Sequence, residues 1–114
     1  MTAEILVIPG CWWLEEFIRS ICYFLRKCGH SVTLISDIPV ERIEGYDLVI
    51  FFADYTDNVG KVEEVTKPIP LLVIPYLTRQ IPEMKLTGTG EVVPFEGCSG
   101  KDLIAVVDRL LSPH

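Results

Sequence analysis

The chain alternates short, continuous apolar runs with stretches in which apolar residues recur every three or four positions. A continuous run of four to seven apolar residues is typical of a strand buried on both faces, as in a parallel sheet. Turn-forming proline and glycine residues separate the runs. Five segments, the last of them short, therefore predict strands: 4–8, 31–35, 47–53, 70–74 and 91–93.

Between the first two predicted strands, the apolar spacing changes to that of a helix, and it predicts one over residues 12–28. Glu15 and Glu16 suit the positive first turn, Arg26 and Lys27 suit the last turn, and Gly29 is a natural residue to end the helix. Seven positions form its core-facing stripe: Leu14, Phe17, Ile18, Ile21, Cys22, Leu25 and Cys28.

Two further helices are expected. A weaker pattern predicts one over residues 59–66. A stronger one begins at Ser99, which is followed three residues later by Asp102, as in a capping box. The segment between the second and third strands is too short for a full crossover helix, and it predicts a single turn at 40–43. The last helix has this apolar stripe: Leu103, Val106, Val107, Leu110 and Leu111.

Strands that alternate with helices imply right-handed crossovers and a parallel sheet covered on both faces. The predicted fold class is therefore α/β: a three-layer, doubly wound, five-stranded parallel sheet in the flavodoxin-like order 2-1-3-4-5. The sequence contains no internal repeat, low-complexity tract or linker that would divide it. We expect residues 1–114 to form a single Rossmann-like domain.

Composition narrows the range of functions. The 114 residues are 49% apolar and 23% charged, and the formal net charge is −6. A negative charge argues against binding the phosphates of DNA or RNA. No apolar run reaches the length of a membrane span, and the sequence does not begin with a basic, apolar leader. We therefore expect no nucleic-acid or membrane partner and a cytoplasmic location.

Cysteine spacing gives no support for a metal site. Cys11, Cys22, Cys28 and Cys98 form no C-x-x-C pair, and the two histidines lie far from any paired thiols. A structural zinc site needs clustered ligands, so no metal and no other cofactor is predicted. Cytosolic thiols usually stay reduced, and we expect Cys22 and Cys28 to be small buried thiols.

Ligands of an open parallel sheet bind beyond the carboxyl ends of its strands, near the point where the strand order reverses. We expect Arg79 to be an anion contact there, because its planar guanidinium matches phosphate or carboxylate. The start of the last helix could hold an anion through its N–H groups. Eight residues expected at this edge are candidates for ligand binding: Gly10, Cys11, Trp12, Asp54, Tyr55, Arg79, Ser99 and Lys101.

Three of these candidates have alternative interpretations. Cys11 precedes a helix, whose dipole favours thiolate and would suit a nucleophile, yet no Cys-x5-Arg phosphate loop is present. Trp12 could stack on a base or sugar, or one ring of the Trp12–Trp13 pair could cap the core. Asp54, with Asp57, could bind a divalent metal or cap the following helix.

The strand–helix order resembles a response-regulator receiver domain over nearly the whole chain. Receivers hold magnesium with an acidic pair after the first strand, where this chain has Pro9 and Gly10. The aspartate that is phosphorylated in receivers ends the third strand, and the nearest candidate in this chain is Asp54. A lysine of the receiver motif is replaced by Val93. The resemblance therefore implies a degenerate receiver-like interaction module. The closest local likenesses are at 92–95 and 101–111.

A second resemblance is to two-domain, Rossmann-like glycosyltransferases. Their helix–Gly-His–strand segment is similar to residues 24–36, and the end of their C-terminal domain is similar to 81–84, 88–94 and 101–111. The resemblance implies nucleotide or sugar handling. The acidic donor-binding motif of those enzymes is missing at 54–64, and the chain supplies one domain where they use two.

The sequence therefore favours a small binding or protein-interaction module without a complete catalytic constellation. The partners to expect are a second copy in a homodimer, another protein, or a small anionic ligand. The alternative is a nucleotide- or sugar-handling enzyme, or a subunit of one, that uses Asp54, Tyr55 and Arg79. A thiol-redox role through Cys11 is the third hypothesis.

Overall fold

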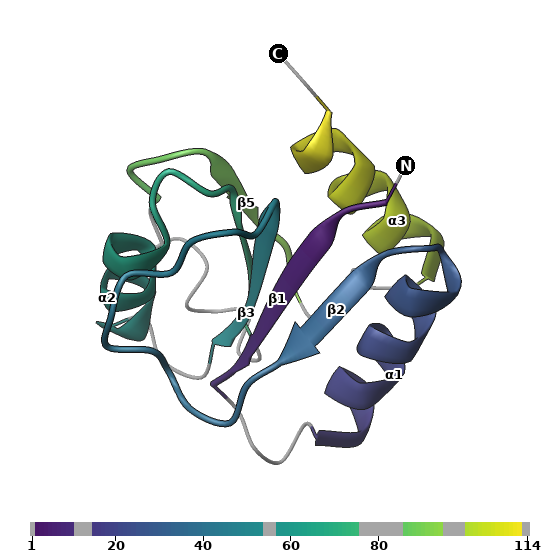
Figure 1. Ribbon diagram of the computed structural model, residues 1–114, viewed down its shortest axis with the longest axis horizontal. Coiled ribbons are helices and arrows are strands. Elements are labelled where there is room, and N and C mark those ends of the chain that lie inside the picture. The colour runs from purple at the N-terminus through teal and green to yellow at the C-terminus, as the bar shows by residue number, and fades with distance from the viewer. Residues whose placement is uncertain (1, 11–14, 54–56, 76–85, 95–99, 113–114) are drawn as a thin grey trace.

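The computed structural model describes residues 2–10, 15–53, 57–75, 86–94 and 100–112. Over these ranges the chain forms five strands and three helices (Figure 1). In chain order these are β1 (Glu4–Pro9), α1 (Glu15–Lys27), β2 (Ser31–Leu34), β3 (Leu48–Ala53), α2 (Asp57–Thr66), β4 (Leu71–Pro75), β5 (Gly90–Val92) and α3 (Gly100–Leu111).

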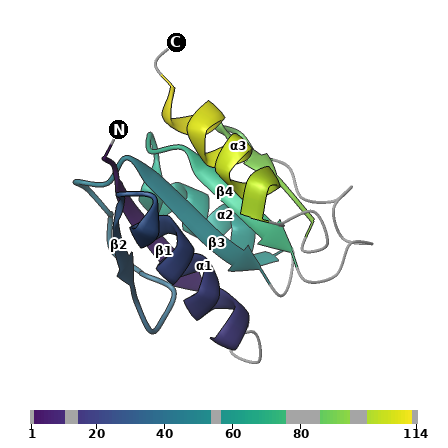
Figure 2. The same ribbon diagram turned by 90° about the vertical axis from the view of Figure 1, so that its right-hand side faces the viewer.

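The strands form one sheet in the order β2-β1-β3-β4-β5, and every neighbouring pair is parallel. In the register, Ile5 lies opposite both Val32 and Leu48. Helices α1 and α3 cover one face of the sheet, and α2 lies on the other (Figures 1 and 2). The predicted three-layer, flavodoxin-like α/β fold is confirmed.

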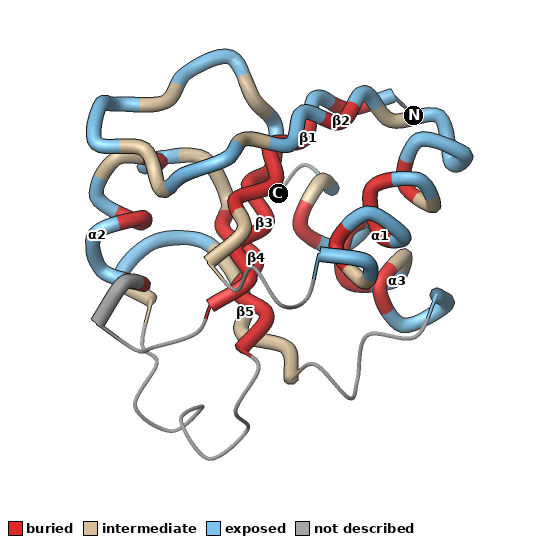
Figure 3. The backbone as a smooth tube through the Cα atoms, turned by 90° about the horizontal axis from the view of Figure 1, so that it is seen from below, coloured by how far each residue is buried: buried red, intermediate tan, exposed pale blue. Residues whose placement is uncertain are grey.

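Burial explains why the strands are continuous apolar runs. All six residues of β3 and all five of β4 are buried, because both faces of the sheet are covered (Figure 3). Alternate residues of β3 pack into opposite layers. Leu48, Ile50 and Phe52 pack with α1 and α3, whereas Val49, Phe51 and Ala53 pack in the layer that contains α2.

Helix α2 is short, and irregular chain completes the cover of its face. Ile38, Ile43 and Tyr46, which lie between β2 and β3, pack against this second layer. The Ile43 N–H donates to the carbonyl oxygen of Val65 at 2.7 Å. The helical turn expected at 40–43 is therefore wrong. The chain there forms bends, and this N–H is satisfied by the end of α2.

Most observed element ends differ from the predicted ones by at most two residues, and the predicted start of the first helix, over residues 12–14, lies outside the described residues. Strand β4 begins and ends one residue later than predicted, and α2 begins two residues earlier, at Asp57. Helix α1 ends at Lys27, and the expectation that Cys28 is buried is wrong, because it lies beyond the last helical residue and is exposed. Phe17 is half-buried and meets the Phe52 ring edge-on, with 6.0 Å between centroids.

A buried carboxylate joins α2 to the chain that enters β5. Glu63 is 5% exposed, and its oxygens accept bonds from the Thr87 N–H at 2.9 and 3.0 Å, the Thr87 hydroxyl at 2.8 Å and the Gly88 N–H at 3.0 Å. Burial alone would raise the pKa of Glu63. The bonds from Thr87 and Gly88, with the charge of Lys67, outweigh it and leave the pKa below its ordinary value.

Truncation of a residue in the centre of the sheet tests the packing. We expect Ile50→Ala to lower the free energy of unfolding by about 2–5 kcal/mol, because Ile50 is fully buried and a cavity would remain. Val40 is 91% exposed, so Val40→Ala is the matched control and should change stability by less than about 0.5 kcal/mol. Chemical denaturation measures both, and equal losses would contradict the two-sided core.

Glu63→Gln tests the buried carboxylate. At pH 7 we expect a loss of about 1–3 kcal/mol, because the substitution weakens bonds made to a charged acceptor. A carboxylate with a depressed pKa stabilises the fold above its unfolded pKa of about 4.3, and this contribution disappears as pH falls through the lower folded pKa. The difference between the two proteins should therefore shrink below about pH 4. A difference that is constant from pH 7 to pH 3 would contradict this assignment.

Candidate functional site

Two of the eight predicted site residues, Gly10 and Lys101, lie among the described residues; Cys11, Trp12, Asp54, Tyr55, Arg79 and Ser99 lie outside them. Lys101 is exposed in the first turn of α3. Gly10 donates its N–H to the carbonyl oxygen of Phe52 at 2.8 Å, and a Cβ there would lie 2.4 Å from that oxygen. Close backbone packing between β1 and β3 thus requires glycine at this position.

At the carboxyl edge of the sheet, a hollow of about 380 Å³ lies between the ends of β1 and β2 and the first turns of α1. We call it the carboxyl-edge hollow. Its charged groups are Arg19 and Glu15, which pair at 2.6 Å on the solvent side of α1. Its lining residues are Pro9, Glu15, Ile18, Arg19, Leu34, Ile35 and Ser36.

The sequence prediction missed this hollow because it considered the loops after the other four strands. The end of β2 reaches the same edge, since all five strands are parallel. Two features of the sequence could have indicated this hollow. Ser36 directly follows the second predicted strand, and Glu15 and Arg19 lie four residues apart on the first predicted helix.

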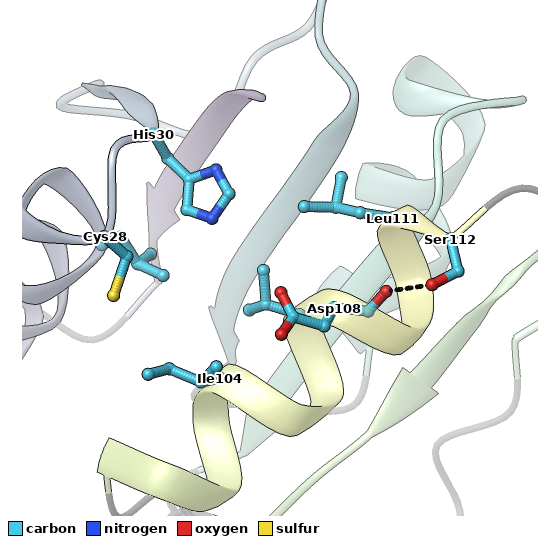
Figure 4. A pocket seen from close by; sticks show the side chains of 8 residues that line it. Cys28, His30, Ile104, Asp108, Leu111 and Ser112 are labelled. Atoms are coloured by element: carbon cyan, nitrogen blue, oxygen red, sulfur yellow. Dashed lines mark hydrogen bonds between the residues drawn. The ribbon is translucent and has the colours of Figure 1, made fainter. Parts of the chain in front are cut away.

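A second hollow, of about 400 Å³, lies at the opposite edge of the sheet, between the C-terminal parts of α1 and α3 (Figure 4). We call it the α1–α3 hollow. Apolar side chains of both helices line it, together with four polar residues. The described residues that line it are Leu25, Cys28, His30, Ile104, Val107, Asp108, Leu111 and Ser112.

The turn that ends α1 places two of these polar residues. Gly29 has a φ of +97°, a conformation that L side chains rarely adopt. Its N–H donates to the Arg26 carbonyl at 3.0 Å, and the His30 N–H donates to the Leu25 carbonyl at 3.2 Å. This is the Schellman pattern of helix termination. It fixes the backbone of Cys28 and His30 at the rim of the hollow.

The imidazole of His30 is held by the start of the chain. Its Nδ1 accepts the backbone N–H of Ala3 at 3.2 Å, and Ala3 is almost fully buried. The Ser31 N–H donates back to the Ala3 carbonyl at 2.9 Å. A nitrogen that accepts a hydrogen bond carries no proton, so this contact requires a neutral ring with its proton on Nε2.

Helix α3 supplies the facing wall. Leu103, Val106 and Leu110 anchor it in the core, which leaves Ile104 and Asp108 on the side of the hollow. In Figure 4, His30 and Asp108 approach the hollow from different elements. Ser112 donates its N–H at 3.0 Å and its hydroxyl at 2.7 Å to the Asp108 backbone carbonyl, and so caps the end of α3.

The two free thiols that the structure describes differ in environment. Cys22 is buried in the core layer under α1. Burial raises its pKa, and the opposing effects of Arg26 and of its own backbone hydrogen bond are smaller. Cys28 is exposed at the α1–α3 hollow.

Within the described ranges, no three His, Cys, Asp or Glu side chains are grouped so that they could hold a metal ion. None of the helices in those ranges is both long and apolar enough to cross a membrane. Comparison of the chain with protein-family models, with curated proteins and with solved structures finds no match in any of the three.

The different burial of the two thiols predicts their reactivity. Under native conditions at pH 8, we expect iodoacetamide to modify Cys28 quickly and Cys22 only when the chain unfolds, since thiolate and access are both needed. Peptide mapping by mass spectrometry gives each cysteine its own rate. Cys28→Ser should remove the fast modification of the peptide that contains residue 28. Equal native rates at Cys22 and Cys28 would contradict the described packing of α1.

Proposed function

We propose that the protein is a small Rossmann-like binding module that takes a small organic ligand in the α1–α3 hollow. The observation that carries the proposal is the make-up of this hollow. Apolar side chains from two helices share it with His30 and Asp108, whose backbones are set by a helix-ending turn and by a helix. Apolar walls with a few fixed polar groups are typical of ligand sites.

The size and the rigidity of the hollow support this proposal. A volume of about 400 Å³ lies within the range of small-molecule sites. Leu25 and Val107 are buried and belong to the core layer. The floor of the hollow is therefore part of the packed domain and needs no rearrangement to receive a ligand.

The carboxyl-edge hollow supports a second candidate function, the binding of a small anionic ligand. Its guanidinium, Arg19, pairs with one carboxylate among the described residues and is mostly exposed, so exchange of that partner for a ligand anion costs little. Ser36 adds a hydroxyl at the same edge. This site would serve the nucleotide- or sugar-handling alternative, because it lies where Rossmann-like folds bind ligands.

Two filling substitutions separate the candidates. Ile104→Trp should block the α1–α3 hollow, and Leu34→Trp, at a residue 38% exposed, should block the carboxyl-edge hollow. We expect hits from a screen of small amines, alcohols and carboxylic acids to lose at least about tenfold in affinity with Ile104→Trp and to keep it with Leu34→Trp. Chemical shift changes in NMR titrations give the affinities and locate the site.

The reverse result would contradict the lead proposal. If hits perturb residues 34–36 and lose affinity only with Leu34→Trp, the carboxyl-edge hollow is the binding site. If neither substitution weakens any hit, both candidates are wrong.

A further inference from the structure

We infer that the ligand of the α1–α3 hollow is a small organic cation, a primary amine on an apolar body, and that the Asp108 carboxylate is its counter-ion. This inference rests on the proposed function, since it names the ligand class of that same hollow. It follows from the charges around the hollow and from the character of its walls.

The backbone makes this edge of the sheet negative. Helix α1 ends at Lys27 and helix α3 ends at Leu111, and both C-termini border the hollow. The C-terminus of a helix carries the negative end of its dipole, which favours a nearby cation. Asp108 adds a full negative charge on the α3 side, and no described hydrogen bond or ion pair engages its side-chain carboxylate.

The basic residues of these two helix ends are occupied elsewhere. Arg26 donates to the carbonyl oxygen of Val32 at 3.0 Å. The ammonium of Lys27 lies 5.1 Å from the centre of the Tyr23 ring.

Arg109, in the last turn of α3, forms a two-pronged ion pair with Glu91 of β5. This pair holds the pKa of Glu91 below its ordinary value, mainly through the hydrogen bond from Arg109. No lysine or arginine is among the described residues that line the hollow, so none of them supplies a cation to Asp108 there.

His30 fits the same conclusion. Its Nδ1 accepts the Ala3 N–H and therefore carries no proton, so the ring adds no positive charge to the hollow while that bond exists. Neutral imidazole and the Leu25, Ile104 and Leu111 side chains then form walls that suit the hydrocarbon part of an amphiphilic cation.

Three probes with the same ring and different charge test the inference: cyclohexylmethylamine, cyclohexylmethanol and cyclohexanecarboxylate. At pH 7 and low salt, we expect the amine to bind about threefold to fivefold more tightly than the alcohol, and the carboxylate more weakly than both, as a partly exposed ion pair allows. The preference should shrink as salt is raised to 1 M. NMR titration of the full chain measures all three affinities.

Variants assign the charge to Asp108. Asp108→Asn should make the amine and the alcohol bind equally, and Asp108→Glu should keep a preference for the amine. Glu16→Gln, in the first turn of α1 at the far end of that helix, removes the same charge and should leave the preference unchanged. The backbone amide spectrum of each variant verifies its fold.

The failures are distinguishable. If none of the three probes shifts the NMR signals of the residues around the hollow, the proposed function and the proposed ligand class are both wrong. If the alcohol binds there as tightly as the amine, the hollow is a binding site but the cationic ligand is wrong. If Asp108→Asn keeps the full preference for the amine, the counter-ion assignment is wrong.

Discussion

The structure depends on the burial of β1, β3 and β4 on both faces. These strands present apolar side chains to both sides, and a sheet of this kind is stable only when each face is covered. One face is covered by two amphipathic helices, and the other by a short helix with the irregular chain between β2 and β3. The placement of α1 beside α3, and with it the hollow between their ends, follows from that requirement.

Much of this fold could be predicted from the sequence, because the period of the apolar pattern differs between buried strands and amphipathic helices. The helix-ending role of Gly29 could also be predicted. The failures involve tertiary contacts. Cys28 fits the helical stripe, yet the turn at Gly29 exposes it. The turn expected at 40–43 is replaced by a contact with α2, which no local pattern reveals.

The candidate site was harder to predict than the fold. Parallel sheets usually bind ligands at their carboxyl edge, so all eight candidate residues were predicted there. Six of the eight lie outside the described ranges. The α1–α3 hollow joins residues 25–30 to residues 104–112, which are more than seventy positions apart. His30 and Asp108 carry no motif that links them, and only the packing of the two helices brings them to one hollow.

The C-terminal turn of α1 connects the hollow with the edge of the sheet. The N–H groups of Ser31 and Ile35 donate to the carbonyl oxygens of Ala3 and Val7. Residues 31, 33 and 35 therefore face β1, and the backbone groups of Val32 point to the free edge of β2. Arg26 donates to the outward-facing Val32 carbonyl. This bond occupies an acceptor that a strand added from another chain would need. Association of two copies through β2 would have to displace that guanidinium.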